Sequence, residues 1–215
     1  MEKTNKFEKN KCERKKTIIL HATALFLEKD IESIKMTDIA KSSKTGVASI
    51  YRYFGTKQKL VIEVGINLWE SINKEYERIY NSVSYLNETG INQCKSLLNI
   101  FNILAENKSL FLKFNYDFDR YVAKEHISKD DLASYEKVII HAQQRFLEAV
   151  YKGRADNTVR SDFDEKIYYL AFTHSLFALT GKVNGPNILK SDDFQHGQKE
   201  VEVVINSFIN YIEKK

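Results

Sequence analysis

Residues 35–57 read KMTDIAKSSKTGVASIYRYFGTK and predict two short helices on either side of a turn. Apolar residues recur at helical spacing in two groups: Met36, Ile39 and Ala40, then Val47, Ile50 and Phe54. Between the groups, residues 42–46 read SSKTG, and these residue types favour turns and helix caps. The pattern therefore predicts helices over residues 36–43 and 47–54.

The second of these helices has a polar outer face that suits DNA. This face carries Ser49, Arg52 and Tyr53, with Tyr51 at its edge. Side chains of moderate length that can hydrogen-bond fit a major groove about 12 Å wide, so the pair indicates a helix-turn-helix. Gly55 ends the helix, Thr56 is a candidate N-cap for the next one, and Lys57 opens it. A lysine there adds charge where backbone N–H groups already favour a phosphate.

A family motif runs through this stretch. Its residues are Asp38-Ile39-Ala40, Ser49-Ile50-Tyr51-Arg52-Tyr53-Phe54, Thr56-Lys57 and Leu60, with Ile18, Ala22 and Phe26 upstream. On these residues the segment resembles the DNA-binding domain of the TetR family of bacterial transcriptional regulators. The chain departs from the family where Lys44 replaces a frequent glycine, Gly46 a serine or threonine, and Ala48 a glycine. Because glycine tolerates positive φ, we predict that Gly46 now supplies that conformation in the turn.

The rest of the sequence predicts an all-α protein. One proline (Pro186) and eight glycines in 215 residues leave long windows without helix breakers. Besides the two helices above, apolar periodicity predicts helices over 13–29, 57–82, 89–106, 109–124, 128–153, 162–182 (starting behind Asp162) and 193–213. We predict a three-helix helix-turn-helix domain at residues 11–58 and a bundle of about six helices at 59–215 for ligand sensing and dimerisation.

Charge is divided unevenly along the chain. Residues 1–57 hold 13 Lys and Arg against 7 Asp and Glu, a net of +6, and residues 58–215 hold 20 against 22, a net of −2. Positive charge therefore accompanies the helix-turn-helix. We interpret residues 1–11 as a solvated lysine-rich tail, and Arg14, Lys15 and Lys16 as attracting phosphates.

The sequence offers no residues for catalysis, a cofactor or a metal. None of the five histidines has a second histidine at helical metal-ligand spacing, and Glu-x-x-His is absent. Phosphate-binding glycine motifs and G-x-S-x-G are also missing. Cys12 and Cys94 are expected to be free thiols. No apolar run approaches a membrane span and no signal peptide is evident, so we expect a cytoplasmic protein.

The resemblance implies a homodimer on a palindromic double-stranded DNA operator, usually as a repressor. The implied DNA-binding residues are Thr37, Thr45, Gly46, Val47, Ser49, Tyr51, Arg52, Tyr53 and Lys57. Among them, Tyr51, Tyr53 and Lys57 would anchor phosphates. Arg52 would contact either guanine or a phosphate, and Thr37 would contact a phosphate or only cap its helix.

The resemblance also implies a small-molecule effector held inside the helical bundle. Candidate lining residues are Trp69, Phe114, Phe118, Tyr121, His141 and Phe177, with a plain core role as the alternative for each. The last two predicted helices carry too much apolar surface for one core, which favours a dimer through them. Two alternative functions stay open: a helical adaptor that has lost DNA binding, and an all-α enzyme on the same scaffold.

Overall fold

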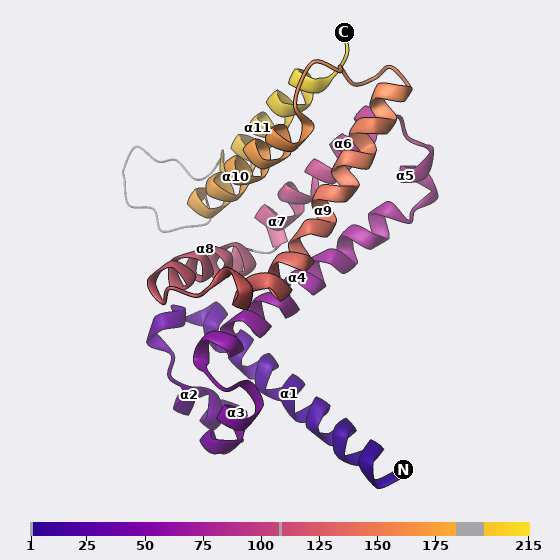
Figure 1. Ribbon diagram of the computed structural model, residues 1–215. Coiled ribbons are helices and arrows are strands. Elements are labelled where there is room, and N and C mark those ends of the chain that lie inside the picture. The colour runs from indigo at the N-terminus through magenta and orange to yellow at the C-terminus, as the bar shows by residue number, and fades with distance from the viewer. Residues whose placement is uncertain (1, 108, 184–195) are drawn as a thin grey trace, which may run out of the picture. The chain divides into compact units, whose positions relative to one another are not determined.

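The computed structural model describes residues 2–107, 109–183 and 196–215 (Figure 1). Its helices are α1 (Glu2–Glu28), the 3₁₀ turn η1 (Ile31–Ser33), α2 (Met36–Ser42), α3 (Val47–Phe54), α4 (Lys57–Tyr80), α5 (Val83–Asn87), α6 (Gly90–Leu98), α7 (Ile100–Asn107), α8 (Ser109–Lys124), α9 (Lys129–Ala155), α10 (Glu165–Val183) and α11 (Gly197–Ile212). No β-strand occurs among the described residues, so the predicted all-α class is confirmed.

The helices form two compact units that interleave along the chain. Unit 1 comprises Met1–Trp69 and Phe114–Glu136, and unit 2 comprises Glu70–Lys113 and Lys137–Lys215. The predicted boundary between a DNA-binding domain at residues 11–58 and a sensing domain at 59–215 divides the chain by function, and it stays a prediction.

The core of unit 1 is built from the apolar faces that the sequence predicts. Its buried residues include Ile18, Ala22 and Phe26 of α1, Ile39 of α2, Ile50 and Phe54 of α3, and Leu60 and Val64 of α4. Spacings of three and four residues bring each set onto one side of its helix, and burial of these side chains holds the helices together. A polar contact adds to this packing, since Nδ1 of His21 lies 2.9 Å from Oγ of Ser42.

Helix α1 is longer than predicted. It begins at Glu2 instead of residue 13, so residues 2–11 belong to the helix rather than to a tail, and residues 8–11 are exposed to solvent as expected (Figure 1). Residues 2–28 contain no glycine or proline, and the lysines and glutamates there are good helix formers. Nothing in this stretch stops the helix once the buried part of α1 has nucleated it.

The turn between α2 and α3 uses Lys44, not Gly46, for positive φ. Lys44 has φ 51°, whereas Gly46 has φ −66° and ψ 139° as the N-cap of α3. Thr45 N–H donates to Ala40 O at 3.0 Å and Lys44 N–H to Lys41 O at 3.4 Å. These two bonds make a Schellman motif, in which the left-handed position follows the C-cap. The expectation for Gly46 is therefore wrong.

We expect Lys44→Gly to stabilise the protein by about 0.5–1 kcal/mol, because a left-handed non-glycine residue costs about 1–2 kcal/mol and glycine offsets part of the gain by its unfolded-state entropy. The measurement is the urea midpoint of unfolding. Lys41→Gly is the matched control, since it removes the same side chain from a regular turn of α2 and should destabilise by about 1 kcal/mol. A lower midpoint for both variants would contradict the expectation.

Unit 2 differs from the predicted helix pattern in three places. A short helix, α5, follows Ser82, whose hydroxyl accepts the amide of Tyr85 at 3.1 Å. The predicted helix 89–106 is interrupted at Asn99 and becomes α6 and α7. Asp164 caps α10 instead of Asp162, since its carboxylate accepts the amides of Lys166 and Ile167, each at 2.9 Å. The predicted start at residue 193 lies outside the described residues.

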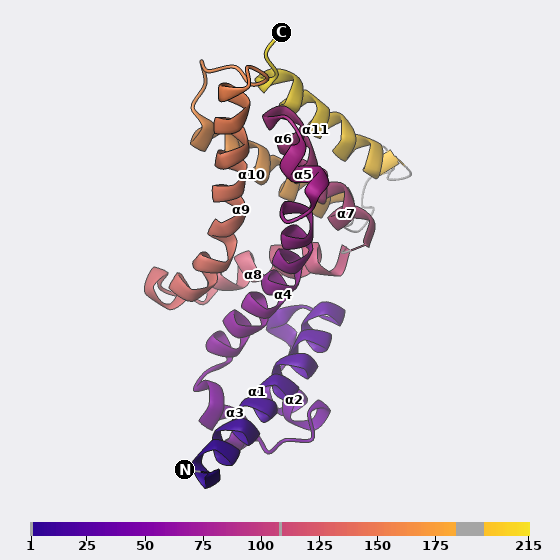
Figure 2. The ribbon, with the colours of Figure 1, turned by 90° about the vertical axis from the view of Figure 1, so that its right-hand side faces the viewer.

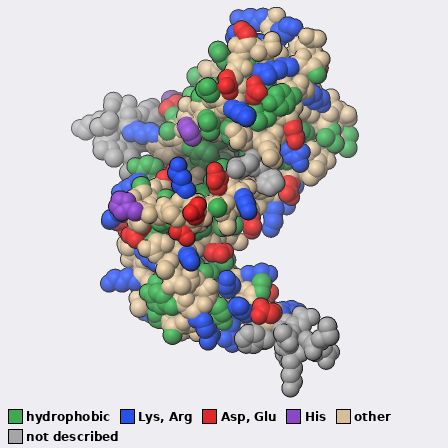
Figure 3. All heavy atoms as spheres, in the orientation of Figure 1, with side chains coloured by type: hydrophobic (Ala, Val, Ile, Leu, Met, Phe, Trp, Pro, Cys, Tyr) green, Lys and Arg blue, Asp and Glu red, His purple; other side chains and the backbone are tan. Residues whose placement is uncertain are grey.

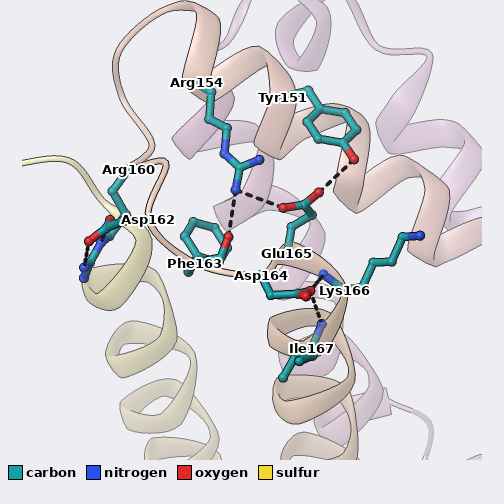
Figure 4. A network of polar contacts seen from close by, with 9 residues as sticks. All are labelled: Tyr151, Arg154, Arg160, Asp162, Phe163, Asp164, Glu165, Lys166 and Ile167. Atoms are coloured by element: carbon teal, nitrogen blue, oxygen red, sulfur yellow. Dashed lines mark hydrogen bonds and ion pairs between the residues drawn. The ribbon is translucent and has the colours of Figure 1, made fainter.

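Helices α10 and α11 pack against each other within unit 2 (Figures 1 and 2). A polar network holds the loop that leads into α10 (Figure 4). In it, Nη2 of Arg154 donates to Glu165 Oε2 at 2.9 Å and to Phe163 O at 3.0 Å, and the Tyr151 hydroxyl donates to the other Glu165 oxygen at 2.9 Å. The network fixes Phe163 beside the first turn of α10.

The start of α6 is hydrogen-bonded to the residues that follow α9. Gly90 N–H donates to Asp156 Oδ2 at 2.8 Å, and Ile91 N–H donates to Thr158 Oγ1 at 3.1 Å. The hydrogen bond to Thr158 lowers the pKa of Asp156 below its ordinary value, despite the opposing effect of desolvation. At the same place a Cβ on Gly90 would lie 2.0 Å from the nitrogen of Gly153, and a Cβ on Gly153 would lie 2.3 Å from the Val159 side chain, so neither glycine has room for one.

Candidate nucleic-acid interface

Helix α3 presents an outward face because its other side is buried. Gly46 precedes it as N-cap, and Gly55 ends it with φ 77°, as predicted. Ile50 and Phe54 point into unit 1, with 0% and 5% of their surfaces exposed. At 3.6 residues per turn, this burial leaves Tyr51 and Arg52 facing outward, and both are exposed.

The structure brings all nine predicted DNA-binding residues onto unit 1. Thr37, Gly46, Tyr51 and Arg52 are exposed, whereas Thr45, Val47, Ser49, Tyr53 and Lys57 are half-buried. They lie on consecutive parts of the chain, from the first turn of α2 through α3 to the start of α4. Thr37 is not the N-cap of α2, which is Lys35, so the alternative capping role does not apply to it. Several basic side chains are visible on the part of the surface that α1–α3 form (Figure 3).

Arginines surround Tyr53. The guanidinium carbon of Arg52 lies 5.4 Å from the centre of the Tyr53 ring. Desolvation alone would raise the pKa of the Tyr53 hydroxyl, but the neighbouring guanidinium groups of Arg52 and Arg14 lower it below its ordinary value. Arg14 belongs to α1, so two helices contribute positive charge beside this phenol.

Lys57 is engaged inside unit 1. Its ammonium donates to Ile31 O at 2.6 Å and to Glu32 O at 3.2 Å, and it lies 5.5 Å from the ring centre of Tyr121 on α8. Desolvation lowers its pKa, and the carboxylates of Glu125 and Glu32 partly counteract that shift. In this conformation the ammonium ties the start of α4 to η1.

We therefore expect Lys57→Met to destabilise the protein by about 2 kcal/mol, because hydrogen bonds from a charged group contribute about 1.5–3 kcal/mol. Methionine keeps the apolar part of the side chain and removes the donor. Urea unfolding at neutral pH measures the effect. Lys59→Met is the control, since Lys59 is exposed two residues further along α4. Equal midpoints for the two variants would show that the ammonium adds nothing to folding.

Three of the predicted ligand-lining residues pack together in unit 1. Phe118 stacks on Tyr135 with ring centres 4.4 Å apart and lies 5.9 Å from Phe114. Trp69 Nε1–H donates to the Tyr135 hydroxyl at 2.9 Å, and that hydroxyl donates to Asn115 at 3.1 Å. Tyr135 was not among the predicted ligand-lining residues, although its place among the apolar residues of α9 marks it as a buried residue.

The remaining candidates lie apart from this cluster. Tyr121 is buried beside Lys57 in unit 1. Phe177 belongs to unit 2, where it packs edge-to-face on Phe101 with ring centres 5.1 Å apart. The side chain of His141 lies outside the described residues. Of the described candidates, Trp69, Phe114, Phe118 and Tyr121 are therefore buried in unit 1, and Phe177 is half-buried in unit 2.

An apolar groove of about 500 Å³ runs over α10 and α11 in unit 2. Its lining residues are Phe163, Asp164, Ile167, Tyr168, Ala171, Val204, Ser207, Phe208 and Tyr211. Ile167 is 66% exposed and Tyr211 51%, and nearby Leu170 and Val203 are 46% and 63% exposed. Large apolar side chains at this exposure are typical of a surface that another molecule covers.

The described residues contain no group of three or more His, Cys, Asp or Glu placed to hold a metal ion. Among the same residues, no helix has the length and apolar character that a membrane crossing requires.

Comparisons with known proteins agree with this geometry. A family model for bacterial regulatory proteins of the tetR family matches residues 18–64. No curated protein matches the chain.

Solved structures match almost the whole chain. A protein classed as a TetR-family transcriptional regulator of Mesorhizobium loti is 13% identical, with a TM-score of 0.68 over 94% of this chain and 98% of its own. The ketosteroid regulator KstR2 of Mycobacterium tuberculosis is 16% identical, with a TM-score of 0.61 over 94% and 96%. A protein classed as a transcriptional regulator of Saccharomonospora viridis, solved in complex with choline, is 16% identical, with a TM-score of 0.69 over 95% and 100%. Residues 18–64 are thus similar to the tetR family of bacterial regulatory proteins, and the chain has the fold of TetR-family transcriptional regulators.

Proposed function

We propose that the protein is a transcriptional repressor that binds a palindromic operator as a homodimer and is released by a small-molecule effector. The observation that carries the proposal is the outward face of α3, where Tyr51 and Arg52 are exposed within the matched helix-turn-helix. In a dimer, each α3 would enter a major groove, with the two grooves about 34–36 Å apart.

Dimerisation through α10 and α11 is supported by their exposed apolar residues and the groove between them. The two-fold mate would present the same surface, so the interface would be self-complementary. We assign the protein to the cytoplasm, where the operator lies, and assign it no catalytic activity.

The effector is the least specified part of the proposal. The choline complex of the S. viridis protein supports small-molecule binding on this fold. An effector would release the operator only if it bound one spacing of the two α3 helices better than the other, and that difference in affinity is the coupling.

The test is binding to the DNA upstream of the protein's own gene, compared with scrambled DNA at about 150 mM salt. Binding on the order of a thousandfold tighter to the native sequence is expected. Salt-dependent binding of equal strength to both DNAs would place the operator elsewhere. No salt-dependent binding to any DNA would favour the adaptor and overturn the proposal.

A further inference from the structure

The extension of α1 divides its charged residues between two faces. Lys11, Arg14 and Lys15 are spaced by three and four residues, so they lie on one face, with Glu8 at its edge. Lys9, Glu13 and Lys16 recur at four and three residues, which places them on a different face. A disordered tail would not separate these residues, whereas a continuous helix does.

The first of these faces is turned toward α3. The ammonium of Lys15 lies 5.4 Å from the centre of the Phe54 ring, at the end of α3. Arg14 lies close enough to Tyr53, also on α3, for its guanidinium to act on the phenol hydroxyl. Lys11 is exposed and lies one turn, about 5–6 Å, further along the same side of α1. In Figure 1 this part of α1 continues past α2 and α3.

The other face has a different electrostatic character. Nζ of Lys16 lies 3.6 Å from a carboxylate oxygen of Glu13, and both side chains are largely exposed. The first face carries three basic residues with one acidic residue at its edge, whereas Lys9 and Lys16 share their face with Glu13, so the first face offers more positive charge to a partner. The structure therefore separates Lys16 from Arg14 and Lys15, which the sequence had grouped together.

We propose that Lys11, Arg14 and Lys15, here called the basic stripe, bind DNA phosphates beside the groove that α3 enters. A helix inside a major groove has phosphates on both sides, and a basic helix face directed toward it neutralises them. The stripe thereby extends the interface along α1, beyond the helix-turn-helix residues. This inference rests on the proposed DNA-binding function and names a further surface for it.

Two double variants test the stripe with matched changes. Lys11→Gln with Arg14→Gln removes two positive charges from the stripe, and Lys9→Gln with Lys16→Gln removes two from the other face of the same helix. Both lower the formal net charge from +4 to +2. The full-length proteins are titrated with the same fluorescent DNA duplexes, one from upstream of the gene and one scrambled, between about 50 and 200 mM salt.

For the stripe variant we expect binding about sixtyfold weaker at 0.1 M salt, since each of the two lost phosphate contacts accounts for roughly eightfold there. The slope of log affinity against log salt should become shallower by about 1.8, equally for both DNAs, because phosphates carry no sequence information. The variant with the other face altered should stay within about twofold of the wild type. In addition, Glu8→Gln should strengthen binding, because it removes a negative charge beside the stripe.

If both double variants weakened DNA binding equally, net charge alone would explain the effect, and the proposed role of the basic stripe would be wrong. Wild-type affinity in the stripe variant would overturn it as well, and in both cases the wild type would still bind DNA, so the proposed function would survive. If the wild type itself showed no salt-dependent binding, the proposed function and the stripe would fall together. Matching unfolding midpoints for all variants establish that folding is unchanged.

Discussion

Gly90→Ala is expected to destabilise the protein by about 3 kcal/mol, the upper end for overpacking, and to abolish folding if the margin is small. A Cβ at this position would lie 2.0 Å from the nitrogen and 2.2 Å from the Cα of Gly153, and 2.7 Å from the carbonyl oxygen of Ala149. All three are backbone atoms, so no flexible side chain can move aside. Helices α6 and α9 would have to separate, which would also strain the bonds to Asp156 and Thr158.

Gly181→Ala provides the control within the same unit. A Cβ there meets no atom within 4 Å, and the position lies in α10, so alanine should stabilise the helix by up to about 1 kcal/mol. Differential scanning calorimetry of both variants gives the comparison. If Gly90→Ala melted within a degree or two of the wild type, the contact between α6 and α9 would be looser than described.

Ile167→Asp with Leu170→Asp is expected to convert the proposed dimer into a monomer. Both side chains are exposed on α10, at 66% and 46%, and lie three residues apart on one face. Because a two-fold interface contains the same surface from both protomers, each substitution would bury two carboxylates in the dimer. An uncompensated buried charge costs about 3–5 kcal/mol. Dimer affinity should therefore fall on the order of a thousandfold or more, and operator binding should fall with it.

Sedimentation velocity measures the outcome against the chain mass of 25.1 kDa. The control is Val83→Asp with Leu86→Asp, another pair three residues apart, at 74% and 58% exposure on α5. This pair should leave the dimer intact. If the variant with Ile167→Asp and Leu170→Asp still had twice the mass of one chain, the dimer interface would lie on another surface.

The sequence predicted those features of the fold that depend on residues close together in the chain. Ile50 and Phe54 could be assigned to the core, and Gly55 to the end of α3, because spacing and backbone freedom act within a few residues. The start of α1 was missed because a lysine-rich segment without repeating apolar residues is compatible with either a solvated tail or a solvated helix. Lys44 was missed because its positive φ follows from the hydrogen bonds that close α2, which residue preference alone does not reveal.

The candidate site divides in the same way. The nine predicted DNA-binding residues all lie on unit 1 because they belong to one continuous stretch of about twenty residues, from α2 to the start of α4, and their role in binding DNA stays a prediction. The contacts of the Lys57 ammonium within unit 1 could not be predicted, because its partners come from η1 and α8, which are distant in the sequence. The aromatic candidates for the effector pocket could not be sorted either, because a pocket and a core use the same residue types at the same spacing.

Unit 1 also limits how the protein can be dissected by cloning. Its fold draws on residues 114–136, through the ion pair of Lys124 with Glu32 at 2.5 Å, the bond of Gln58 to Glu125 at 2.9 Å, and the ring of Tyr135 against Phe118. A fragment that stops after the helix-turn-helix would lack all of these partners and expose the apolar side of α4. A chimera that joins the helix-turn-helix to another protein would therefore need to carry both segments of the chain that form unit 1.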